Sequence, residues 1–550
     1  MSYQWKVAAK ASGTKAIINQ LLINRGFKTP KAIKDFFHPS LPQKADFPLA
    51  KAVARIKQAV KLHELIYIYG DYDADGITAT AILWEALHSL DARVMPYIPS
   101  RNEPIRGLSP LGIDNIIKLS SKLYHLKPDL IITVDNGISA FKGCEYAKKL
   151  GIDVIISDHH VPRDTKLPPA VAIVHTTNLA GAGVAWFLAR EVLRHLRGEK
   201  IPHLGGELLD LAGIGTIADM VPLLNTNRAL AKFGLEALRQ TTRPGLKVLA
   251  KLAELDLTTL QAWQVGYSLA PRLNAMGRME QALDALRLIC TQSPDKAKDL
   301  AVNIQATNQL RQDKTSQMFQ DAKNKFLAAD QTVKLIFVSS KDYHEGVVGL
   351  VAGRLAEEFN RPAFVVAIGQ HYAKASCRTP KGFNAIESIR SLSHLLMEHG
   401  GHELAAGFTC AVDKLPEIKL KLEKLAAADL TADSTTPALN IDCQLEIKDI
   451  NWELFNELEK FQPFGFGNPQ PVFSLNQVKL KSCYPVGQEK KHLKLTLQGE
   501  TLKVEAIAFN FGHLADQLKP GQPIDIAFTL DANSWNSHQS LQLKIKDIIA

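Results

Sequence analysis

The chain has 550 residues, of which 46% are hydrophobic and 22% are charged, and these values exclude a disordered or fibrous protein. The length predicts several folding units, because one domain usually comprises about 100 to 200 residues. The 65 lysines and arginines outnumber the 56 acidic residues and give a formal charge of +9, which weakly favours a polyanionic partner.

The cysteine pattern and the lengths of the apolar runs predict the cellular compartment. The six cysteines are dispersed without a Cys-x-x-Cys pair, which argues against a zinc knuckle and a disulfide scaffold and favours a reducing compartment. The start of the chain lacks the apolar run of a signal peptide, and no stretch reaches the roughly eighteen apolar residues that a membrane span needs. We therefore expect a cytoplasmic protein that does not contact membranes.

Residues 51–255, after an N-terminal segment at 1–50, alternate short apolar runs with amphipathic stretches. This alternation predicts an α/β domain with a parallel sheet and helices on both faces. Residues 225–255 at its end look helical. The expected strands are 65–69, 93–98, 130–134 and 154–156, and the expected helices are 78–89 and one that begins at 111.

Two further folding units are expected after a helical connector at 256–330, in which residues 283–325 are rich in helix formers. Residues 331–425 predict a smaller α/β domain, with strands at 333–338 and 363–367 and a helix at 347–359. A linker at 426–437 is rich in Ala, Thr and Ser. Residues 438–550 then alternate apolar and polar side chains with period two, which predicts a small β-barrel with lysines on its outer face.

Acidic and imidazole side chains follow three of the predicted strands in the first α/β domain. Gly70-Asp71-Tyr72-Asp73-Ala74-Asp75-Gly76 follows the first strand, Asp135 follows the third, and Asp158-His159-His160 follows the fourth. The carboxyl ends of parallel strands meet at one edge of a sheet, so we expect these side chains to converge. Hard ions such as Mg²⁺ or Mn²⁺ prefer such ligands, and two ions about 4 Å apart support phosphodiester hydrolysis.

Other interpretations of these motifs carry less weight. Asp-x-Asp-x-Asp-Gly also opens a calcium-binding EF-hand loop, but no Glu stands at the twelfth position and an apolar strand precedes the motif. Asp135 alone would most simply cap a helix, and isolated histidines are more often structural than catalytic. Their arrival together at strand ends favours a site with two metal ions.

These motifs resemble the DHH phosphoesterase superfamily and, within it, the RecJ family of single-strand-specific exonucleases. The resemblance extends along the chain, because residues 215–222 are similar to the fourth DHH motif and residues 400–407 are similar to the DHHA1 signature. It implies a DHH domain, a DHHA1 domain and a C-terminal OB-fold. It also implies two Mn²⁺ or Mg²⁺ ions, with Asp135 as the shared ligand; the implied metal ligands are Asp73, Asp75, Asp135, His159 and Asp219.

Asp219 enters through the resemblance alone, since residues 208–220 would otherwise be interpreted as an ordinary amphipathic helix. The same resemblance implies close supporting or phosphate-contacting roles for a second set of side chains. The members of this implied catalytic set are Asp71, Asp158, His160 and His402.

Contacts to DNA are implied in the same way. A terminal 5′-phosphate would be held by guanidinium groups and small residues, and the OB-fold lysines would follow the strand. The implied contacts are Arg101, Arg278, His344, Ser376, Arg378, Gly400, Gly401, Lys494, Lys544 and Lys546, together with Lys490, Lys491 and Trp535. A simple helix-cap turn is the alternative for the two glycines, and ordinary surface solvation is the alternative for the charged residues.

The chain departs from the family pattern at three places. Arg106 stands about where many members carry an aromatic residue, so we do not expect base stacking by this loop. His175-Thr176 replaces an Asn-Pro pair, so contacts there are not carried over. Cys377 replaces a commoner glycine, and we expect it to narrow the phosphate pocket.

The resemblance implies an enzyme that threads one unpaired DNA strand between the DHH and DHHA1 domains and degrades it from 5′ to 3′ in recombination and repair. Single-strand-binding protein and a helicase are the implied partners. A small-substrate DHH phosphoesterase, such as an oligoribonuclease or cyclic-dinucleotide hydrolase, would share the metal ligands but lack the barrel. A manganese pyrophosphatase is disfavoured, because Tyr69 stands where that branch has a histidine. A scaffold that only binds nucleic acid would have lost ligands.

Overall fold

The computed structural model describes residues 3–100, 107–162, 165–197, 208–330, 332–430, 437–499, 502–535 and 538–550, except for the side chains of 534, 535 and 538. The chain divides into two compact units, one formed by residues 25–308 and 457–470 and the other by residues 1–24, 309–456 and 471–550. Within the described ranges, no helix combines the length and the apolarity that crossing a bilayer demands.

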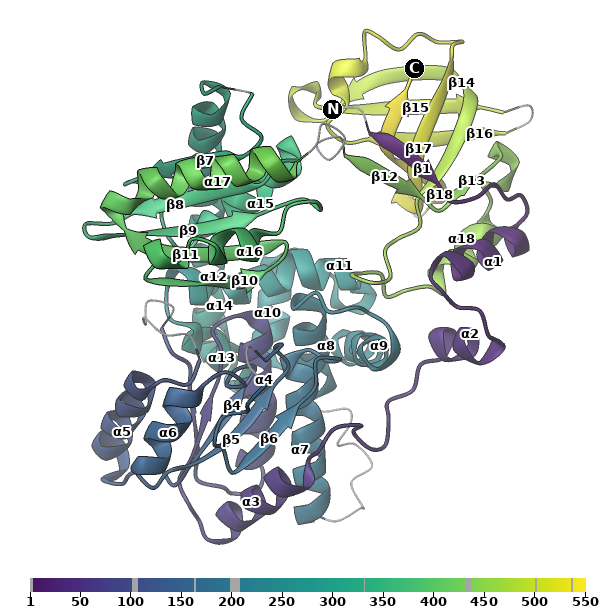
Figure 1. The fold of residues 1–550 in the computed structure, drawn as a ribbon. Helices are drawn as coiled ribbons and strands as arrows, with labels where there is room; N and C mark the ends of the chain where they lie inside the picture. Colours follow the sequence, from purple (N-terminus) through teal and green to yellow (C-terminus); the bar gives the residue numbers. More distant parts are fainter. Residues whose placement is uncertain are drawn as a thin grey trace. The chain divides into compact units, whose positions relative to one another are not determined.

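A five-stranded parallel sheet organises the unit that contains residues 25–308 (Figure 1). Its order is β3 (Val94–Tyr97), β2 (Ile66–Tyr69), β4 (Leu130–Val134), β5 (Asp153–Asp158) and β6 (Ala172–His175). Strand β3 lies on one side of β2, and strand β4 lies on the other side. The chain therefore reverses direction across the sheet between β2 and β4, where open α/β folds place their ligands.

Helices cover both faces of this sheet, as the sequence predicts (Figure 1). The helices are α3 (Ala50–Lys61), α4 (Ala74–His88), α5 (Pro110–Tyr124), α6 (Phe141–Lys149) and α7 (Gly181–Arg197). All four residues of β2 are buried. Ile66 and Ile68 join a core with α3, α4 and α7, whereas Tyr67 and Tyr69 pack with α5 and α6. Burial on both faces explains why β2 is apolar without alternation.

Helix α4 begins earlier than the sequence prediction of residue 78. The Asp73 side chain accepts a hydrogen bond of 3.0 Å from the Gly76 N–H and caps the helix, which therefore starts at Ala74. Asp75 lies in the first helical turn. Asp73 therefore lies at the cap of the helix and Asp75 within it, so the predicted start at residue 78 was wrong.

Further helices complete this unit and lead out of it. They are α2 (Pro30–Phe37), α8 (Leu209–Ala218), α9 (Asn225–Arg239), α10 (Pro244–Leu252), α11 (Ala262–Gln264), α12 (Ala270–Met279), α13 (Ala282–Cys290) and α14 (Pro294–Leu327), with a 3₁₀ turn at Leu257–Thr259 and a π-helical stretch at Val265–Leu269. The continuous helical stretch expected at 225–255 is two helices. Pro244 lacks an N–H group and has a fixed φ, so it ends one helix and suits the start of the next.

A second, mixed sheet lies in the other unit, in the order β10 (Glu398–His402), β11 (Ala405–Ala411), β9 (Tyr372–Arg378), β8 (Ala363–Ile368) and β7 (Ile336–Ser340). Only β7 and β8 pair in parallel. Its helices are α15 (Val348–Phe359), α16 (Ala385–Arg390) and α17 (Leu415–Asp429), with 3₁₀ turns at Ser393–Leu395 and Val412–Lys414. The smaller α/β fold was therefore predicted correctly, although its first strand starts later than expected.

The C-terminal strands form a closed barrel of five strands, because β14 pairs with both β15 and β17. Its elements are β13 (Cys443–Gln444), β14 (Phe473–Val486), β15 (His492–Gln498), β16 (Lys503–Ala508), β17 (Pro523–Trp535) and β18 (His538–Ile549), with α18 (Trp452–Glu459) and 3₁₀ turns at Ile447–Asp449, Gln488–Lys490 and Gly512–Leu514. Leu493, Leu495 and Leu497 are fully buried, which confirms the predicted alternation.

The first residues of the chain pack with this barrel rather than with the parallel sheet. Strand β1 (Gln4–Val7) pairs with β12 (Ala438–Ile441), and α1 (Thr14–Asn24) follows. The Trp5 indole N–H donates a hydrogen bond of 2.7 Å to the Asp547 carboxylate of β18. Residues from the two ends of the sequence therefore share one compact unit.

Candidate metal centre

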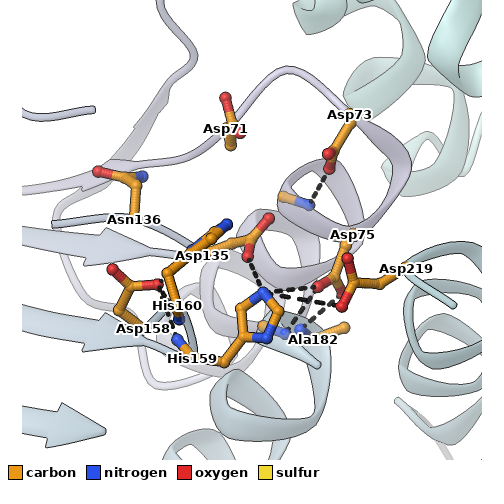
Figure 2. A network of polar contacts seen from close by, with 12 residues as sticks. Asp71, Asp73, Asp75, Asp135, Asn136, Asp158, His159, His160, Ala182 and Asp219 are labelled. Carbon is orange, nitrogen blue, oxygen red and sulfur yellow. Dashed lines mark hydrogen bonds and ion pairs between the residues drawn. The ribbon is translucent and has the colours of Figure 1, made fainter. Parts of the chain in front are cut away.

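Acidic and imidazole side chains converge at the carboxyl edge of the parallel sheet (Figure 2). Asp71, Asp73 and Asp75 follow β2, Asp135 follows β4, and Asp158 is the last residue of β5. The next two residues, His159 and His160, extend the same edge, and Asp219 arrives from the C-terminal end of α8. The sequence argument from strand ends predicted the convergence of all these residues except Asp219.

Three groups of these side chains can each hold a metal ion, since the ligand atoms within each group lie within 4.8 Å of one another. The groups are Asp71, Asp73 and Asp135; Asp75, His159 and Asp219; and Asp135, His159 and His160. Asp135 belongs to two groups, and so does His159. The geometry therefore offers neighbouring cation positions with Asp135 as a group that both can share.

The imidazole of His159 faces three carboxylates (Figure 2). Its Nε2 lies 3.1 Å from Asp135 Oδ1, 3.7 Å from Asp219 Oδ2 and 4.0 Å from Asp75 Oδ2. Burial, with the nearby charge of His160 second, lowers the pKa of His159 to about 4, so the ring is neutral at pH 7. A neutral imidazole is the form that binds a metal.

The buried carboxylates favour a cation strongly. Burial, followed by the charges of neighbouring aspartates, raises the pKa of Asp75 to about 7 and that of Asp219 to about 8, and it raises the pKa of Asp135 well above its usual range. Asp135 Oδ1 and His159 Nε2 are buried and lie 3.1 Å apart, and within the described residues neither atom makes a hydrogen bond of acceptable geometry. Buried polar atoms without partners are costly, and a divalent ion that takes oxygen and nitrogen ligands would satisfy both atoms.

Asp158 holds the histidine loop rather than facing the other carboxylates. It is buried and accepts hydrogen bonds from the N–H groups of Ile138 (2.8 Å), His159 (2.7 Å) and His160 (3.1 Å), and from the His160 ring at 2.8 Å. Burial alone would raise the pKa of Asp158, but the hydrogen bonds and the charge of His160 outweigh it and lower the pKa. Asp158 therefore orients both histidines.

His160 carries a positive charge at neutral pH. Burial lowers its pKa, but the hydrogen bond and the charge of Asp158 outweigh burial and raise the pKa to about 9. Its side chain is 47% exposed, in contrast to the buried Asp158. The pair thus presents a cation at the rim of an acidic site.

Asp135 adopts a left-handed backbone conformation with φ of 62°. This conformation is uncommon for a residue with a side chain, and it recurs at functional sites. The adjacent Asn136 side chain donates to the carbonyls of Val134 (2.9 Å) and Tyr69 (3.1 Å), and so ties the ends of β4 and β2 together. The turn that carries Asp135 is thereby fixed against the turn that carries Asp71.

Sequence reasoning missed the backbone groups that hold Asp75. The N–H groups of Gly181 and Ala182, at the start of α7, donate to the two oxygens of Asp75 at 2.7 and 2.8 Å. A Cβ atom on Gly181 would lie 2.5 Å from Asp135 Oδ1, and one on Gly215 would lie 2.6 Å from Asp75 Oδ1. The glycines at the start of α7 are the signal that could have indicated this close approach.

Residues 271–278 also support the metal centre, in addition to the phosphate contacts predicted there. Asn274 of α12 accepts a hydrogen bond of 2.7 Å from the Ala74 N–H, directly beside Asp73. A Cβ atom on Gly277 would lie 2.1 Å from the Tyr72 carbonyl oxygen. Helix α12 therefore packs directly against the loop that carries Asp71 and Asp73.

Comparison with protein-family models divides the chain into three matched regions. Residues 65–216 match the N-terminal domain of the DHH family, residues 331–428 match the DHHA1 domain, and residues 441–547 match the RecJ OB domain. These regions correspond to the parallel sheet, the mixed sheet and the barrel.

Curated relatives match nearly the whole chain. The single-stranded-DNA-specific exonuclease RecJ of Escherichia coli is 31% identical, with 97% of this chain and 95% of that protein covered. RecJ of Bacillus subtilis is 38% identical, with 96% of this chain and 67% of that protein covered. The chain belongs to the RecJ family.

Solved structures of the RecJ family agree with the fold. The structure of RecJ from Thermus thermophilus in complex with Mn²⁺ aligns with a TM-score of 0.84 at 30% identity, and covers 100% of this chain and 79% of that chain. The Mg²⁺ complex of the same protein aligns with a TM-score of 0.77 at 30% identity, over 99% of this chain and 78% of that chain. The metal ions of these relatives suit the acidic and imidazole cluster described above.

Ser376 and Arg378, which RecJ resemblance predicts as phosphate ligands, lie on the same face of β9, with Arg378 Nη1 3.3 Å from Ser376 Oγ. Gly349 of α15 lies beside them, since its Cβ would stand 3.0 Å from Ser376 Oγ. Cys377 points to the opposite face and is fully buried in the core. The expectation that Cys377 narrows the phosphate pocket was wrong, because neighbouring residues of a strand face opposite sides.

The remaining predicted contacts of the DHHA1 region lie on turns and edges. The ring of His344 accepts a hydrogen bond of 3.1 Å from the Gly346 N–H just before α15. Gly400, Gly401 and His402 lie on the edge strand β10 rather than in a helix-cap turn. Gly401 has φ of 139°, and a Cβ there would lie 2.4 Å from Ala406 Cα, so packing against β11 requires glycine.

Several predicted lysines of the barrel form ion pairs on its surface. Lys494 lies 3.2 Å from Glu505, Lys544 pairs with Asp531, and Lys491 pairs with Glu489 at 2.6 Å. Lys490 and Lys546 are exposed. Arg278 is half-buried on α12 in the unit of the metal centre. Arg101, Arg106 and the side chain of Trp535 lie outside the described residues.

Proposed function

We propose that this chain is a metal-dependent exonuclease that degrades single-stranded DNA from 5′ to 3′ in recombination and repair. One observation carries the proposal: hard-metal ligands from the ends of three neighbouring strands converge, and two of their buried atoms, Asp135 Oδ1 and His159 Nε2, make no hydrogen bond within the described residues. Relatives named single-stranded-DNA-specific exonuclease match almost the whole length of the chain. A RecJ OB domain accompanies the cluster in the same chain.

Two Mn²⁺ or Mg²⁺ ions are proposed as cofactors, with Asp73, Asp75, Asp135, His159 and Asp219 as their ligands and Asp135 shared between them. When bound, such ions supply a water of lowered pKa and stabilise negative charge on the leaving oxygen. The chain contributes the orientation of these ligands. Its Asp75 carboxylate is held by two backbone N–H groups, and its His159 ring is kept neutral by burial.

His160, Asp71 and Asp158 are proposed to act around the metal ligands. The charged His160 ring stands beside the carboxylates, at a place where it can donate to a phosphodiester oxygen. The Asp71 carboxylate accepts a 2.8 Å hydrogen bond from the Tyr72 N–H and lies within the first group of metal-binding side chains. Asp158 fixes the loop, and His402 is proposed as a further phosphate donor.

The 5′ polarity is proposed to come from capture of a terminal phosphate. The hydroxyl of Ser376 and the guanidinium of Arg378 are adjacent on β9, which suits bidentate recognition of a phosphate. Arg278, Arg101 and His344 are proposed to join them, and Gly400 and Gly401 to let the strand approach β10. A pocket that binds a terminal phosphate would fix which end of the strand is degraded first.

The barrel is proposed to guide the unpaired strand with Lys494, Lys544 and Lys546, since basic surfaces on OB-folds commonly bind single strands. Single-strand-binding protein and a helicase are proposed as partners, and the cytoplasm is proposed as the location. The domain limits along the sequence are proposed as 1–50, 51–255, 256–330, 331–425 and 438–550.

Digestion of labelled DNA tests the proposal. Single strands and duplexes labelled at the 5′ or the 3′ end are incubated with Mn²⁺ or Mg²⁺ and the wild-type chain or Asp135→Ala. We expect shortening of single strands from the 5′ end, slow attack on duplexes, and no cleavage by the variant. Release of nucleotides from the 3′ end would contradict the proposed polarity.

The same assay separates the rival functions. Activity on dinucleotides but not on longer strands would favour a small-substrate phosphoesterase, although the match of residues 441–547 to a RecJ OB domain favours long DNA. Binding of single strands without cleavage would favour a scaffold. The complete set of acidic and imidazole groups argues against that outcome.

A further inference from the structure

A short segment near the C-terminal end of the sequence belongs to the compact unit of the metal centre. Residues Glu457–Gln470, called here the insertion segment, cluster with Arg25–Asn308, whereas the residues on both sides of it cluster with the other unit. Phe461 and Asn468 of the segment are fully buried. The segment is therefore a structural part of the unit that carries the parallel sheet.

The insertion segment packs against the loop that follows Asp219. The Leu223 N–H donates a hydrogen bond of 2.7 Å to the Phe466 carbonyl. A Cβ on Gly467 would lie 2.8 Å from Pro222 Cβ, and a Cβ on Gly465 would lie 2.7 Å from Leu223 Cδ1. The backbone of the segment thus touches the chain three and four residues after Asp219.

Arg228 anchors the insertion segment. Its guanidinium is buried and donates hydrogen bonds of 2.7 Å to the carbonyls of Gln462 and Phe36, and it lies 3.9 Å from the centre of the Phe36 ring. Burial, with the charge of Arg25 second, lowers its pKa to about 10, and no carboxylate is among the groups that shift this pKa. A buried charge is costly unless it is well hydrogen-bonded, so the contacts of Arg228 with these carbonyls hold the insertion segment in a defined position.

A second set of contacts makes the segment rigid. The Asn468 side chain donates to the carbonyls of Phe461 (2.8 Å) and Pro463 (3.0 Å) and accepts from Arg25 Nε at 3.1 Å. The Asn227 side chain, one residue before Arg228, donates to the Pro222 carbonyl at 3.2 Å. The loop after Asp219 is therefore held from the segment on one side and from α9 on the other.

We propose that Arg228 is a positioning residue for the metal centre: by anchoring the insertion segment against residues 219–223, it sets where the Asp219 carboxylate stands. The inference rests on the proposed function, in which Asp219 is a metal ligand. The guanidinium of Arg228 donates to the carbonyl of Phe36 and to carbonyls of the insertion segment, and the Arg228 backbone N–H donates to the Leu224 carbonyl at 3.2 Å. Its effect passes through Gln462, Phe466 and the backbone of Leu223.

Metal binding to the full chain tests this role without relying on cleavage. Mn²⁺ binding is measured by titration calorimetry and by electron paramagnetic resonance for the wild type, Arg228→Met and Asp219→Asn. We expect two ions to bind the wild type, and one of them to bind both variants at least about tenfold more weakly, as expected when the support of a ligand is lost. Arg228→Lys, which can reach one carbonyl, should recover part of the affinity.

Arg190 supplies a matched control in the same unit. It also lies over aromatic rings, 4.6 Å from that of Trp186 and 4.7 Å from that of Phe187, and donates to the carbonyls of Pro42 and Gln43. Arg190→Met should lower Tm to a similar degree and leave both Mn²⁺ affinities unchanged. Equal weakening of Mn²⁺ binding by Arg190→Met and Arg228→Met would overturn the inference, since lost stability would then explain both.

The outcomes also separate this inference from the proposed function. If Arg228→Met binds both ions as the wild type does, the positioning role is wrong and the proposed function stands. A wild-type chain that binds no Mn²⁺ would instead contradict the proposed function. If Arg228→Met does not fold, Mn²⁺ binding is measured for Gly467→Ala instead. That change should strain the same loop, because Gly467 has φ of 75° and lies against Pro222. Unchanged Mn²⁺ affinity in Gly467→Ala would overturn the inference.

Discussion

The metal centre and the surface of the barrel both depend on charged side chains, but they hold them in opposite ways. At the metal centre, Asp75 and Asp135 are each 2% exposed and crowd other carboxylates. On the barrel, Lys494 and Lys544 are partly exposed and each faces an acidic partner. The first arrangement is unfavourable without a cation, whereas the second is already balanced.

This difference indicates where single substitutions matter. Carboxylates that are buried together cannot be hydrated, so they depend on the residues that position them and on a bound cation. Substitution of such a positioning residue should therefore affect function. Exposed ion pairs contribute little, since water and salt screen them. We therefore expect large effects from single changes at the metal centre and small effects from single changes on the barrel.

Replacement of a shared ligand should have the largest effect. In Asp135→Asn, we expect exonuclease activity to fall on the order of a thousandfold or more, because a neutral amide cannot share two cations. The metal-free variant should have a higher Tm than the wild type, since a carboxyl group that burial and its neighbours disfavour is replaced by a neutral amide that can donate to His159 Nε2. Steady-state digestion and thermal denaturation without metal measure the two changes.

A fall in both activity and metal-free Tm would contradict this account of Asp135. That result would mean that the carboxylate stabilises the fold rather than crowding it.

Substitution of a glycine next to the metal ligands should have the second largest effect on activity. Gly181→Ala places a methyl group 2.5 Å from Asp135 Oδ1, so we expect activity to fall by about 10- to 100-fold. Gly183→Ala, on the same helix, is the control, because the nearest atoms to its Cβ would belong to leucine side chains, with Leu230 Cδ1 at 3.1 Å and Leu179 Cβ at 3.4 Å. Equal activity of the two variants would indicate that the site tolerates displacement of Asp135.

The pH dependence of metal binding should be smaller but distinctive. In the metal-free fold, Asp75 and Asp219 release their protons near pH 7 and 8, whereas the unfolded chain releases them near 3.8. Because the folded state binds these protons more tightly than the unfolded state, the free energy of unfolding is higher in acid. It falls as the pH rises towards 7 to 8, where the folded state loses the protons. A cation replaces these protons, so it should raise Tm more at pH 8 than at pH 6.

Thermal denaturation with and without Mg²⁺ at the two pH values measures this effect. The variant Asp219→Asn should show a weaker dependence on pH. A rise in Tm that is the same at pH 6 and pH 8 would mean that the buried carboxylates are already ionised without metal.

Single lysines on the barrel should give the smallest effects. Lys481 lies beside Lys503, whose hydrogen bond and charge lower the pKa of Lys481. Among the described residues Lys481 forms no ion pair that binding to a phosphate would break. We expect Lys481→Ala to reduce the salt dependence of binding to oligothymidine by about 0.7 in log–log slope. Lys494→Ala should change it less, because Glu505 already pairs with Lys494.

Fluorescence anisotropy over a range of salt concentrations measures both slopes. A larger effect from Lys494→Ala than from Lys481→Ala would show that strand binding breaks the pair with Glu505. A loss of binding above tenfold from either change would contradict the expectation that single changes on the barrel have small effects.

The sequence was sufficient for the order of the domains and for most of the metal centre. Strand-length apolar runs predicted β2, β4 and β5, and the carboxyl ends of parallel strands must meet at one edge. The positions of Asp71, Asp135 and Asp158 therefore followed from local pattern alone. Alternation in 493–497 predicted a strand of the barrel in the same way.

Tertiary structure alone decided which groups support the ligands and how the loops are held. Asn274 meets Ala74 across 200 residues, and Phe466 meets Leu223 across a comparable stretch of sequence. Local periodicity contains no information about such distant contacts. The capping bond of Asp73 and the close approach of Gly181 likewise depend on geometry at the scale of single atoms, which residue type and spacing do not specify.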